Sequence, residues 1–207
     1  MSSNFDHVIQ KTRQYWTVDG LSEIVLGALF LTLGLYFFAQ VYFGQDSLVS
    51  NLMQSGLILV IIGAFLGGKR LTAFLKARIT YPRTGYVAYR KPDRKNKWLS
   101  IGFAILVATA GILSFLVGPV PLDWMPAITG LLGGVFFFII ASQLNLLRFY
   151  TLSLISLIIG AGLAVAGFGN LLGFSLYYFL LGLVLLLSGS LTLRNYLLDN
   201  RALPSEE

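Results

Sequence analysis

Few of the 207 residues have side chains that could carry out chemistry. The chain has no cysteine and one histidine, His7, which lies outside every apolar stretch. These counts exclude disulfides, iron–sulfur clusters, cysteine nucleophiles, a haem held by two histidines and a zinc site built from several histidines. They also exclude a Ser-His-Asp triad within the apolar segments. The sequence therefore predicts no enzyme activity, no catalytic residue, no metal site and no cofactor.

The polar side chains inside the apolar segments are uncharged. Ionisable groups within a membrane usually mark proton relays, ion pathways or voltage sensors, and none lies in the middle of an apolar stretch here. Hydroxyl and amide groups could line a path for a neutral solute, but they more often bond to helix carbonyls or to a neighbouring helix. The residues concerned are Thr109, Ser114, Ser142, Gln143, Ser153, Ser156, Ser175, Tyr177, Tyr178, Ser188 and Ser190.

The elements that carry these side chains are predicted to be membrane-spanning helices. The chain is 56% hydrophobic and 12% charged, whereas a soluble domain has roughly 25% charged residues. This composition excludes an ordinary soluble fold, a disordered chain and a nucleic-acid-binding domain. Apolar stretches of about 18 residues or more are long enough to cross a bilayer as helices. Such stretches occur at 21–43, 49–68, 99–118, 127–146, 150–169 and 173–194.

These stretches are rich in Leu, Gly and Ala and lack two-residue alternation, which favours helices over barrel strands. We therefore predict an all-α integral membrane protein with six transmembrane helices arranged as three hairpins. The predicted segments are an amphipathic interfacial helix at 1–18, hairpins at 19–68, 99–146 and 147–196, a basic loop at 69–98 and a polar tail at 197–207.

The distribution of charge predicts the orientation of these segments. Most of the 15 Lys and Arg residues lie in 69–98, and the others precede the first span or follow the fourth or sixth. The other three connections hold only Asp46 and Asp123 as charged residues. Basic residues remain on the cytoplasmic side, so both termini and the 69–98 loop are predicted to be cytoplasmic. The net charge of +6 then mostly reflects topology.

Two carboxylates stand at the start of the first span, and they allow two interpretations. Asp19 precedes the span directly, and Glu23 lies in its first turn. Both positions suit the capping of a helix N-terminus, where negative charge is favourable. The alternative is that the two residues are counter-ions for the basic loop, or a cation site at the cytoplasmic end of the helix.

Glycines at helical spacing are predicted to pack the helices together. In lipid no hydrophobic force acts between helices, so small residues that allow close approach hold a bundle together. A homo-oligomer formed through one such face is the alternative use. The predicted packing residues are Gly63, Gly67, Gly130, Gly134, Gly160 and Gly162.

The 69–98 loop concentrates the candidate binding residues. In its first part, Leu71 and Phe74 lie on one arc with Lys76 opposite, which predicts a helix that turns along the membrane surface. Around Pro82 and Gly85 the pattern predicts a β-hairpin. Basic residues attract anionic headgroups by roughly 1 kcal/mol each. The predicted contacts with a partner or lipid are Lys69, Arg70, Lys76, Arg78, Tyr81, Arg83, Tyr86, Tyr89, Arg90, Lys91, Arg94, Lys95 and Lys97.

The loop also contains the segment Tyr-Pro-Arg-Thr-Gly-Tyr-Val at 81–87. This segment resembles a cytoplasmic-loop motif of uncharacterised bacterial multi-span membrane proteins. The resemblance implies a location in the bacterial inner membrane, which is the plasma membrane of the cell. It brings no activity and no site residue with it.

Together these features predict a non-catalytic membrane protein. We expect an accessory or scaffold subunit whose basic loop contacts anionic lipid and a partner protein in the membrane or cytoplasm. The alternative is a small oligomeric channel or transporter for an uncharged or lipid-like substrate. A third class is a lipid-binding or membrane-shaping protein. No nucleic acid is expected as a partner.

Overall fold

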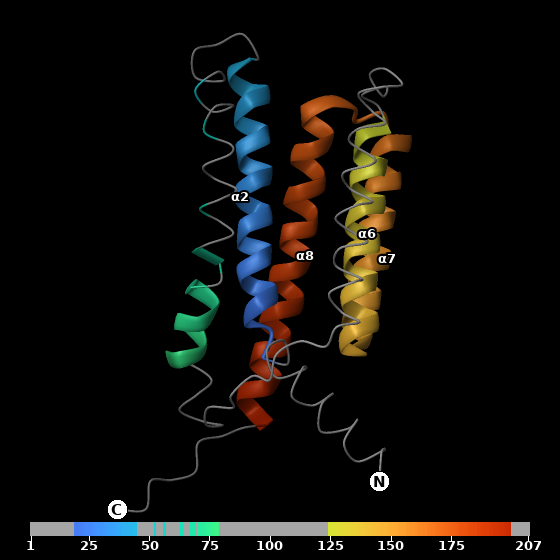
Figure 1. Ribbon diagram of the computed structural model, residues 1–207. Coiled ribbons are helices and arrows are strands. Elements are labelled where there is room, and N and C mark those ends of the chain that lie inside the picture. The colour runs from blue at the N-terminus through green and yellow to red at the C-terminus, as the bar shows by residue number, and fades with distance from the viewer. Residues whose placement is uncertain are drawn as a thin grey trace, which may run out of the picture. The chain divides into compact units, whose positions relative to one another are not determined.

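The computed structural model describes residues 19–44, 67–68, 70–78 and 124–199, together with the single positions 52, 56 and 63. This part of the chain is helical apart from short connections (Figure 1). A short helix covers 70–78. The long helices are α2 (Leu21–Phe43), α6 (Met125–Leu144), α7 (Leu147–Val165) and α8 (Asn170–Asp199).

All four long helices are long and apolar enough to cross a membrane. Their most apolar windows have mean hydropathies between 1.7 and 2.2. Only 22% to 33% of the residues in these windows are buried within the protein. The apolar surface therefore faces outward to a degree that a soluble protein does not tolerate. The chain is a multi-pass membrane protein.

The prediction of six transmembrane helices in three hairpins is wrong. The described residues contain four helices that could span a membrane. The predicted third span, 99–118, lies outside the described residues, as does the predicted second span, 49–68, except for isolated positions. The N-terminal helix predicted at 1–18 and the β-hairpin predicted within 79–89 also lie outside the described residues. The prediction counted every apolar stretch of sufficient length as a span, whereas such a length makes a crossing possible without requiring it.

The helix ends follow from local backbone chemistry. Gly20 precedes α2 in the left-handed region (φ 73°), and Gly44 follows the helix with φ 77°. Pro126 lies in the first turn of α6, where its missing N–H costs nothing. Asn145 ends that helix in the left-handed region (φ 53°), and its N–H donates to the carbonyl of Ala141 at 2.7 Å. Asparagine tolerates this conformation better than most residues, so it permits the tight reversal into α7.

The chain divides into two compact units, and α2 and α8 each contribute to both. The first unit contains α2 up to Thr32, the 70–78 helix and α8 from Gly182 onward. The second contains the rest of α2 up to Tyr42, the helices α6 and α7, and α8 up to Leu181. The contacts below all lie within one unit or the other.

Glycines pack α2 against α8 in an antiparallel pair. A Cβ on Gly27 would lie 2.9 Å from the backbone nitrogen of Leu186, and one on Gly34 would lie 2.8 Å from that of Phe179. The seven-residue period on both helices is the period that keeps one face of each helix against its partner. The facing positions are Gly20 with Gly189, Gly27 with Gly182, and Gly34 with Ser175.

In the second unit, α6 and α7 pack as closely. A Cβ on Gly160 would lie 2.6 Å from the Cα of Gly130, so the two backbones touch with no side chain between them. Phe137 on α6 and Leu152 on α7 are also buried, with exposures of 0% and 2%. Close contact between backbones is how helices associate when lipid removes the hydrophobic driving force.

Candidate functional site

The candidate site lies in the first unit, where the 70–78 helix meets the start of α2. Two contacts set the direction of this segment. A Cβ on Gly68 would lie 3.7 Å from the side chain of Val25. Eight residues later, Lys76 reaches Asp19, which precedes α2. The segment therefore runs alongside α2 in the opposite direction, level with the first turns of the apolar span.

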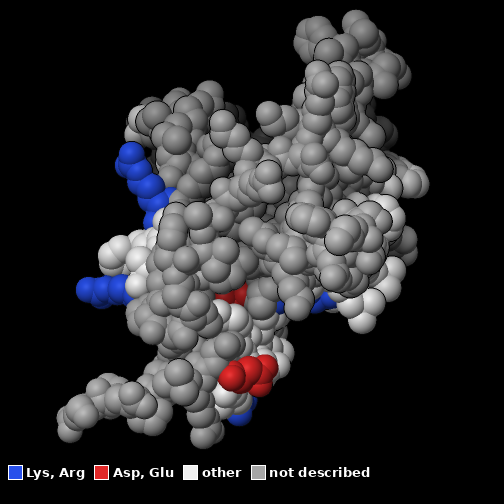
Figure 2. All heavy atoms as spheres, turned by 60° about the horizontal axis from the view of Figure 1, so that its bottom comes forward, with Lys and Arg blue, Asp and Glu red and all other residues white. Residues whose placement is uncertain are grey.

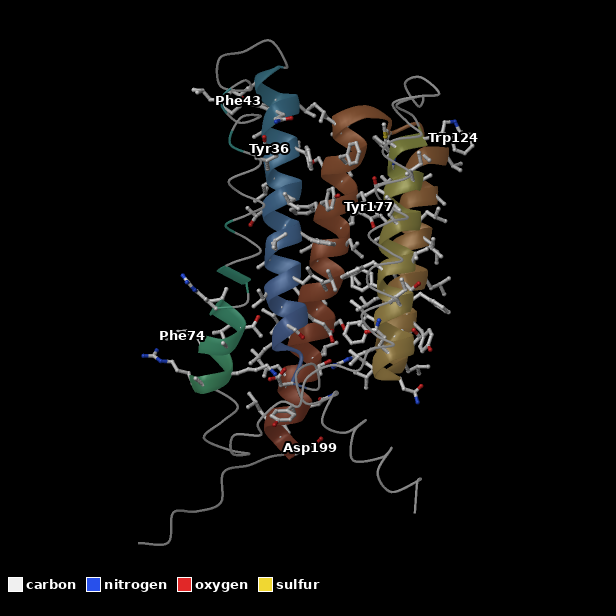
Figure 3. The ribbon with its side chains drawn as sticks, viewed as in Figure 1. Tyr36, Phe43, Phe74, Trp124, Tyr177 and Asp199 are labelled. Atoms are coloured by element: carbon white, nitrogen blue, oxygen red, sulfur yellow. The ribbon has the colours of Figure 1, made fainter. Side chains whose placement is uncertain are left out.

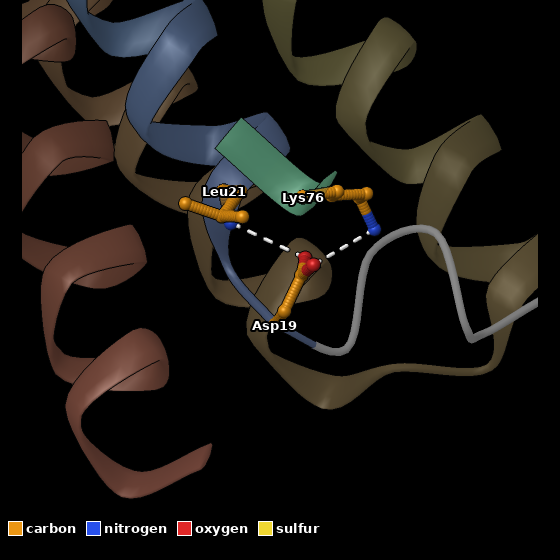
Figure 4. A network of polar contacts seen from close by, with 3 residues as sticks. All are labelled: Asp19, Leu21 and Lys76. Carbon is orange, nitrogen blue, oxygen red and sulfur yellow. Dashed lines mark hydrogen bonds and ion pairs between the residues drawn. The ribbon is translucent and has the colours of Figure 1, made fainter. Parts of the chain in front are cut away.

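The Asp19 carboxylate makes two contacts at this point (Figure 4). Its Oδ1 accepts a hydrogen bond from the backbone N–H of Leu21 at 3.3 Å. Its Oδ2 lies 2.8 Å from Nζ of Lys76. The first contact satisfies a backbone donor at the start of α2, and the second makes Asp19 a counter-ion for the basic loop. The N-cap position of α2 is Gly20, which has no side-chain cap hydrogen bond, so Asp19 acts from one residue before the cap. Of the two interpretations, the contact with Lys76 supports the counter-ion.

The ion pair is almost fully removed from the surface. The side chain of Lys76 is 0% exposed and that of Asp19 is 1% exposed. Taking two such charges out of water costs several kcal/mol per ion, and this cost is offset only by close contact and additional hydrogen bonds. The positive end of the α2 dipole further favours the carboxylate. The pair therefore joins the 70–78 helix to α2 at a defined point.

Glu23 extends this polar cluster toward α8. The hydroxyl of Ser188 donates to Oε2 of Glu23 at 2.7 Å, and Glu23 is 2% exposed. The hydroxyl of Thr192, one turn further along α8, donates to the carbonyl of Ser188 at 2.8 Å. Glu23 thus joins α2 to α8 four residues after Asp19, which joins α2 to the basic loop, and both contacts lie in the first unit.

The 70–78 helix presents its apolar side chains outward. Leu71 is 46% exposed and Phe74 is 56% exposed, whereas Lys76 faces inward. Figure 3 shows Phe74 on the side of this helix that points away from α2. The contacts with Val25 and Asp19 show that the segment runs alongside the first turns of α2. The side of the 70–78 helix opposite its apolar arc faces α2, where Asp19 is the counter-ion of Lys76.

Basic side chains dominate the exposed charge of the described residues. Figure 2, in which the bottom of Figure 1 comes forward, shows Lys and Arg side chains projecting from the surface. Arg70 and Arg78 are exposed on the 70–78 helix, and Arg194 is exposed near the end of α8. The guanidinium of Arg78 lies 5.3 Å from the centroid of the Phe74 ring. The cluster buries its acidic groups at Asp19 and Glu23, and the arginines remain outside.

A second polar network lies in the second unit and joins three helices. The hydroxyl of Ser156 on α7 donates to the carbonyl of Gly130 on α6 at 3.0 Å. It also lies 2.8 Å from the hydroxyl of Tyr177 on α8. Since Ser156 has one proton to give, the Tyr177 hydroxyl is the donor in the second contact. Figure 3 places Tyr177 between α8 and the α6–α7 pair.

Other hydroxyls in this unit bond in the same way. Ser153 on α7 donates to the carbonyl of Gly134 at 2.7 Å, and Ser175 on α8 donates to that of Gly34 on α2 at 2.9 Å. These hydroxyls therefore act in helix packing. A glycine partner is suited to this contact because it lets the donor approach the backbone closely.

The residues predicted from the sequence fall into different places. Gly130, Gly134 and Gly160 lie in the contact between α6 and α7. A Cβ added at Gly63, Gly67 or Gly162 would meet no atom of the described residues within 4 Å. The following predicted contact residues lie outside the described part of the chain: Lys69, Tyr81, Arg83, Tyr86, Tyr89, Arg90, Lys91, Arg94, Lys95 and Lys97.

Sequence reasoning missed the glycines that pack α2 against α8. The signal was present as the seven-residue spacing of Gly20, Gly27 and Gly34, matched by Gly182 and Gly189. A search for spacings of four residues overlooks this pattern. Spacings of both lengths keep residues on one face of a helix.

Among the described residues, no three His, Cys, Asp or Glu side chains gather as a potential metal-binding group. Comparison of the chain with protein-family models, curated proteins and solved structures gives no match.

Proposed function

We propose that this chain is a non-catalytic accessory or scaffold subunit of the bacterial inner membrane, with a cytoplasmic loop at 69–98 that binds a partner protein and anionic lipid. The observation that carries the proposal is the buried contact between Lys76 and Asp19. It ties the first helix of the loop to the start of a transmembrane helix.

A loop that is held at its start is better suited to binding than a free one. Association is weakened by the entropy lost when a flexible segment becomes ordered. The Asp19–Lys76 pair lowers that cost by fixing the 70–78 helix before a partner arrives. Tyr81, Arg83 and Tyr86 follow this helix within eight residues of Arg78 in the sequence.

The hydroxyl groups of the long helices also favour a structural role. Ser153, Ser156 and Ser175 each donate to a backbone carbonyl of a neighbouring helix. Groups that coordinate a passing solute need free donors or acceptors along a continuous path. These three are instead engaged in helix packing, which supports the scaffold over the transporter.

The proposal is tested by recovering partners from the native membrane. The tagged full-length chain is extracted gently and analysed by native mass spectrometry, alongside the triple variant Tyr81→Ala, Arg83→Ala and Tyr86→Ala. We expect a stoichiometric partner protein with the parent and its loss with the triple variant, at equal membrane insertion. The matched control is Arg194→Ala, which removes an exposed arginine of α8 outside the loop and should keep the partner.

Recovery of the partner at the parent level by the triple variant would defeat the docking role of these residues. A symmetric oligomer that carries only lipid would defeat the accessory role altogether. Solute flux in proteoliposomes containing this chain alone would then favour the channel or transporter.

A further inference from the structure

We infer that the outer face of the 70–78 helix binds an anionic phospholipid, with Arg70 and Arg78 at the headgroup and Leu71 and Phe74 against the acyl chains. The inference deepens the lipid part of the proposed function and rests on it. It does not depend on a protein partner.

The position of the helix places this face at the border of the membrane. The apolar span of α2 begins at Leu21, two residues after Asp19. Lys76 contacts Asp19, and Gly68 lies beside Val25 in the second turn of α2. The 70–78 helix is therefore level with the first turns of the span, where headgroups meet acyl chains.

Apart from the two exposed arginines, the polarity of the helix is the reverse of that in a soluble protein. Its ammonium group, on Lys76, is buried against Asp19, whereas Leu71 and Phe74 are 46% and 56% exposed. Water disfavours this arrangement, because apolar area stays exposed while a charge is buried. A hydrocarbon surrounding favours it. The orientation of the side chains therefore indicates lipid on the outer side.

The arginines add the preference for negative charge. Arg70, Phe74 and Arg78 are four residues apart and share one stripe of the helix. Arg78 lies over the Phe74 ring with its guanidinium carbon 5.3 Å from the centroid, a contact that leaves its N–H groups able to bond to phosphate oxygens. Among the described residues, neither arginine forms a salt bridge. A phospholipid with a net negative charge supplies both the apolar and the anionic contact.

The test measures which lipid gathers at this face. The chain has no cysteine, so Ala73→Cys on the exposed side gives one site for a fluorophore. The full-length labelled protein is placed in phosphatidylcholine nanodiscs that contain nitroxide-labelled phosphatidylglycerol or nitroxide-labelled phosphatidylcholine. Each arginine should increase the preference for the anionic lipid about fivefold, so the two together should increase it roughly 25-fold. We therefore expect the fluorescence to fall by half at a mole fraction of labelled phosphatidylglycerol roughly 25-fold lower than that of labelled phosphatidylcholine.

The lipid ratio is the mole fraction of labelled phosphatidylcholine at half-quenching divided by that of labelled phosphatidylglycerol. The variants Arg70→Gln and Arg78→Gln should each reduce this ratio about fivefold. Both positions are exposed and glutamine stays polar, so the fold is retained. The matched control is Arg194→Gln, which removes an exposed arginine from α8 and should leave the ratio unchanged. Equal quenching by the two lipids, or a ratio that neither variant lowers, would overturn the inference.

Quenching by neither lipid would also overturn it, because the face would then be covered by protein. The outcome separates this inference from the scaffold proposal. Loss of the protein partner with a normal lipid ratio defeats only the scaffold proposal. Loss of the lipid ratio with normal partner recovery defeats only the inference drawn here for 70–78.

Discussion

The buried contact between Asp19 and Lys76 makes a quantitative prediction about stability. Asp19→Asn keeps a side-chain oxygen for the Leu21 N–H but removes the charge that faces Lys76. Lys76→Met keeps the length of the side chain and removes the ammonium. Each single change leaves one buried charge without its counter-ion in this contact. Because both side chains are at most 1% exposed, each change should cost about 3 kcal/mol of the free energy of unfolding.

The double variant should be far less destabilised than the sum of the single ones. With neither charge present, a neutral amide and a thioether face each other, and neither of the two positions holds a desolvated ion. We expect the double variant to lie within about 1 kcal/mol of the parent, which corresponds to a coupling of roughly 5 kcal/mol between the two positions. Such a coupling is the signature of direct interaction between the two side chains.

The measurement is a double-mutant cycle on the full-length chain, with the free energy of unfolding obtained by titration with a denaturing detergent in mixed micelles. The control is Arg78→Met on the exposed side of the same helix, which should change the free energy by less than about 0.5 kcal/mol. If the two single effects add within about 0.5 kcal/mol, the pair is not coupled. The 70–78 helix would then be held to α2 by other contacts, and the argument for a fixed loop would fail.

Two further predictions concern the second unit. Gly160→Ala should destabilise the chain by about 1–3 kcal/mol in the same titration, because the new methyl meets the Gly130 backbone. The control is Gly162→Ala, whose methyl would meet no atom of the described residues within 4 Å and which should be neutral or stabilising. Equal effects of the two variants would contradict the packing of α6 against α7. Ser156→Ala removes a donor to Gly130 and the acceptor for Tyr177, and should cost about 1 kcal/mol. Tyr177→Phe leaves the bond from Ser156 to Gly130 intact and should cost less, and the reverse order would refute the assigned direction of the bonds.

The sequence predicts the long helices well where apolar length alone decides them. The first span, predicted at 21–43, coincides with α2 at Leu21–Phe43. The spans predicted at 127–146 and 150–169 are found at Met125–Leu144 and Leu147–Val165. The shift arises because Asn145 adopts a left-handed conformation and ends α6 there, a choice that hydropathy does not record. Helix α8 continues to Asp199 through polar residues that hydropathy assigns to a tail.

The sequence by itself determined that this is a membrane protein, that its long helices are apolar and that its basic residues are concentrated in one loop. It also identified Asp19 and Glu23 as the acidic residues at the start of the first span. Composition and charge suffice for these conclusions, because the cost of placing a residue in lipid depends mainly on its own chemistry.

Only the tertiary structure decided which groups meet. It pairs Asp19 with Lys76, joins Glu23 to Ser188, and sets the glycines of α2 against those of α8. A polar group in a low-dielectric interior must find a partner, but the partner comes from another helix, and the periodicity of one helix does not name it. Close backbone contact at glycines sets the register between α2 and α8, and the ion pair of Asp19 with Lys76 attaches the loop to α2.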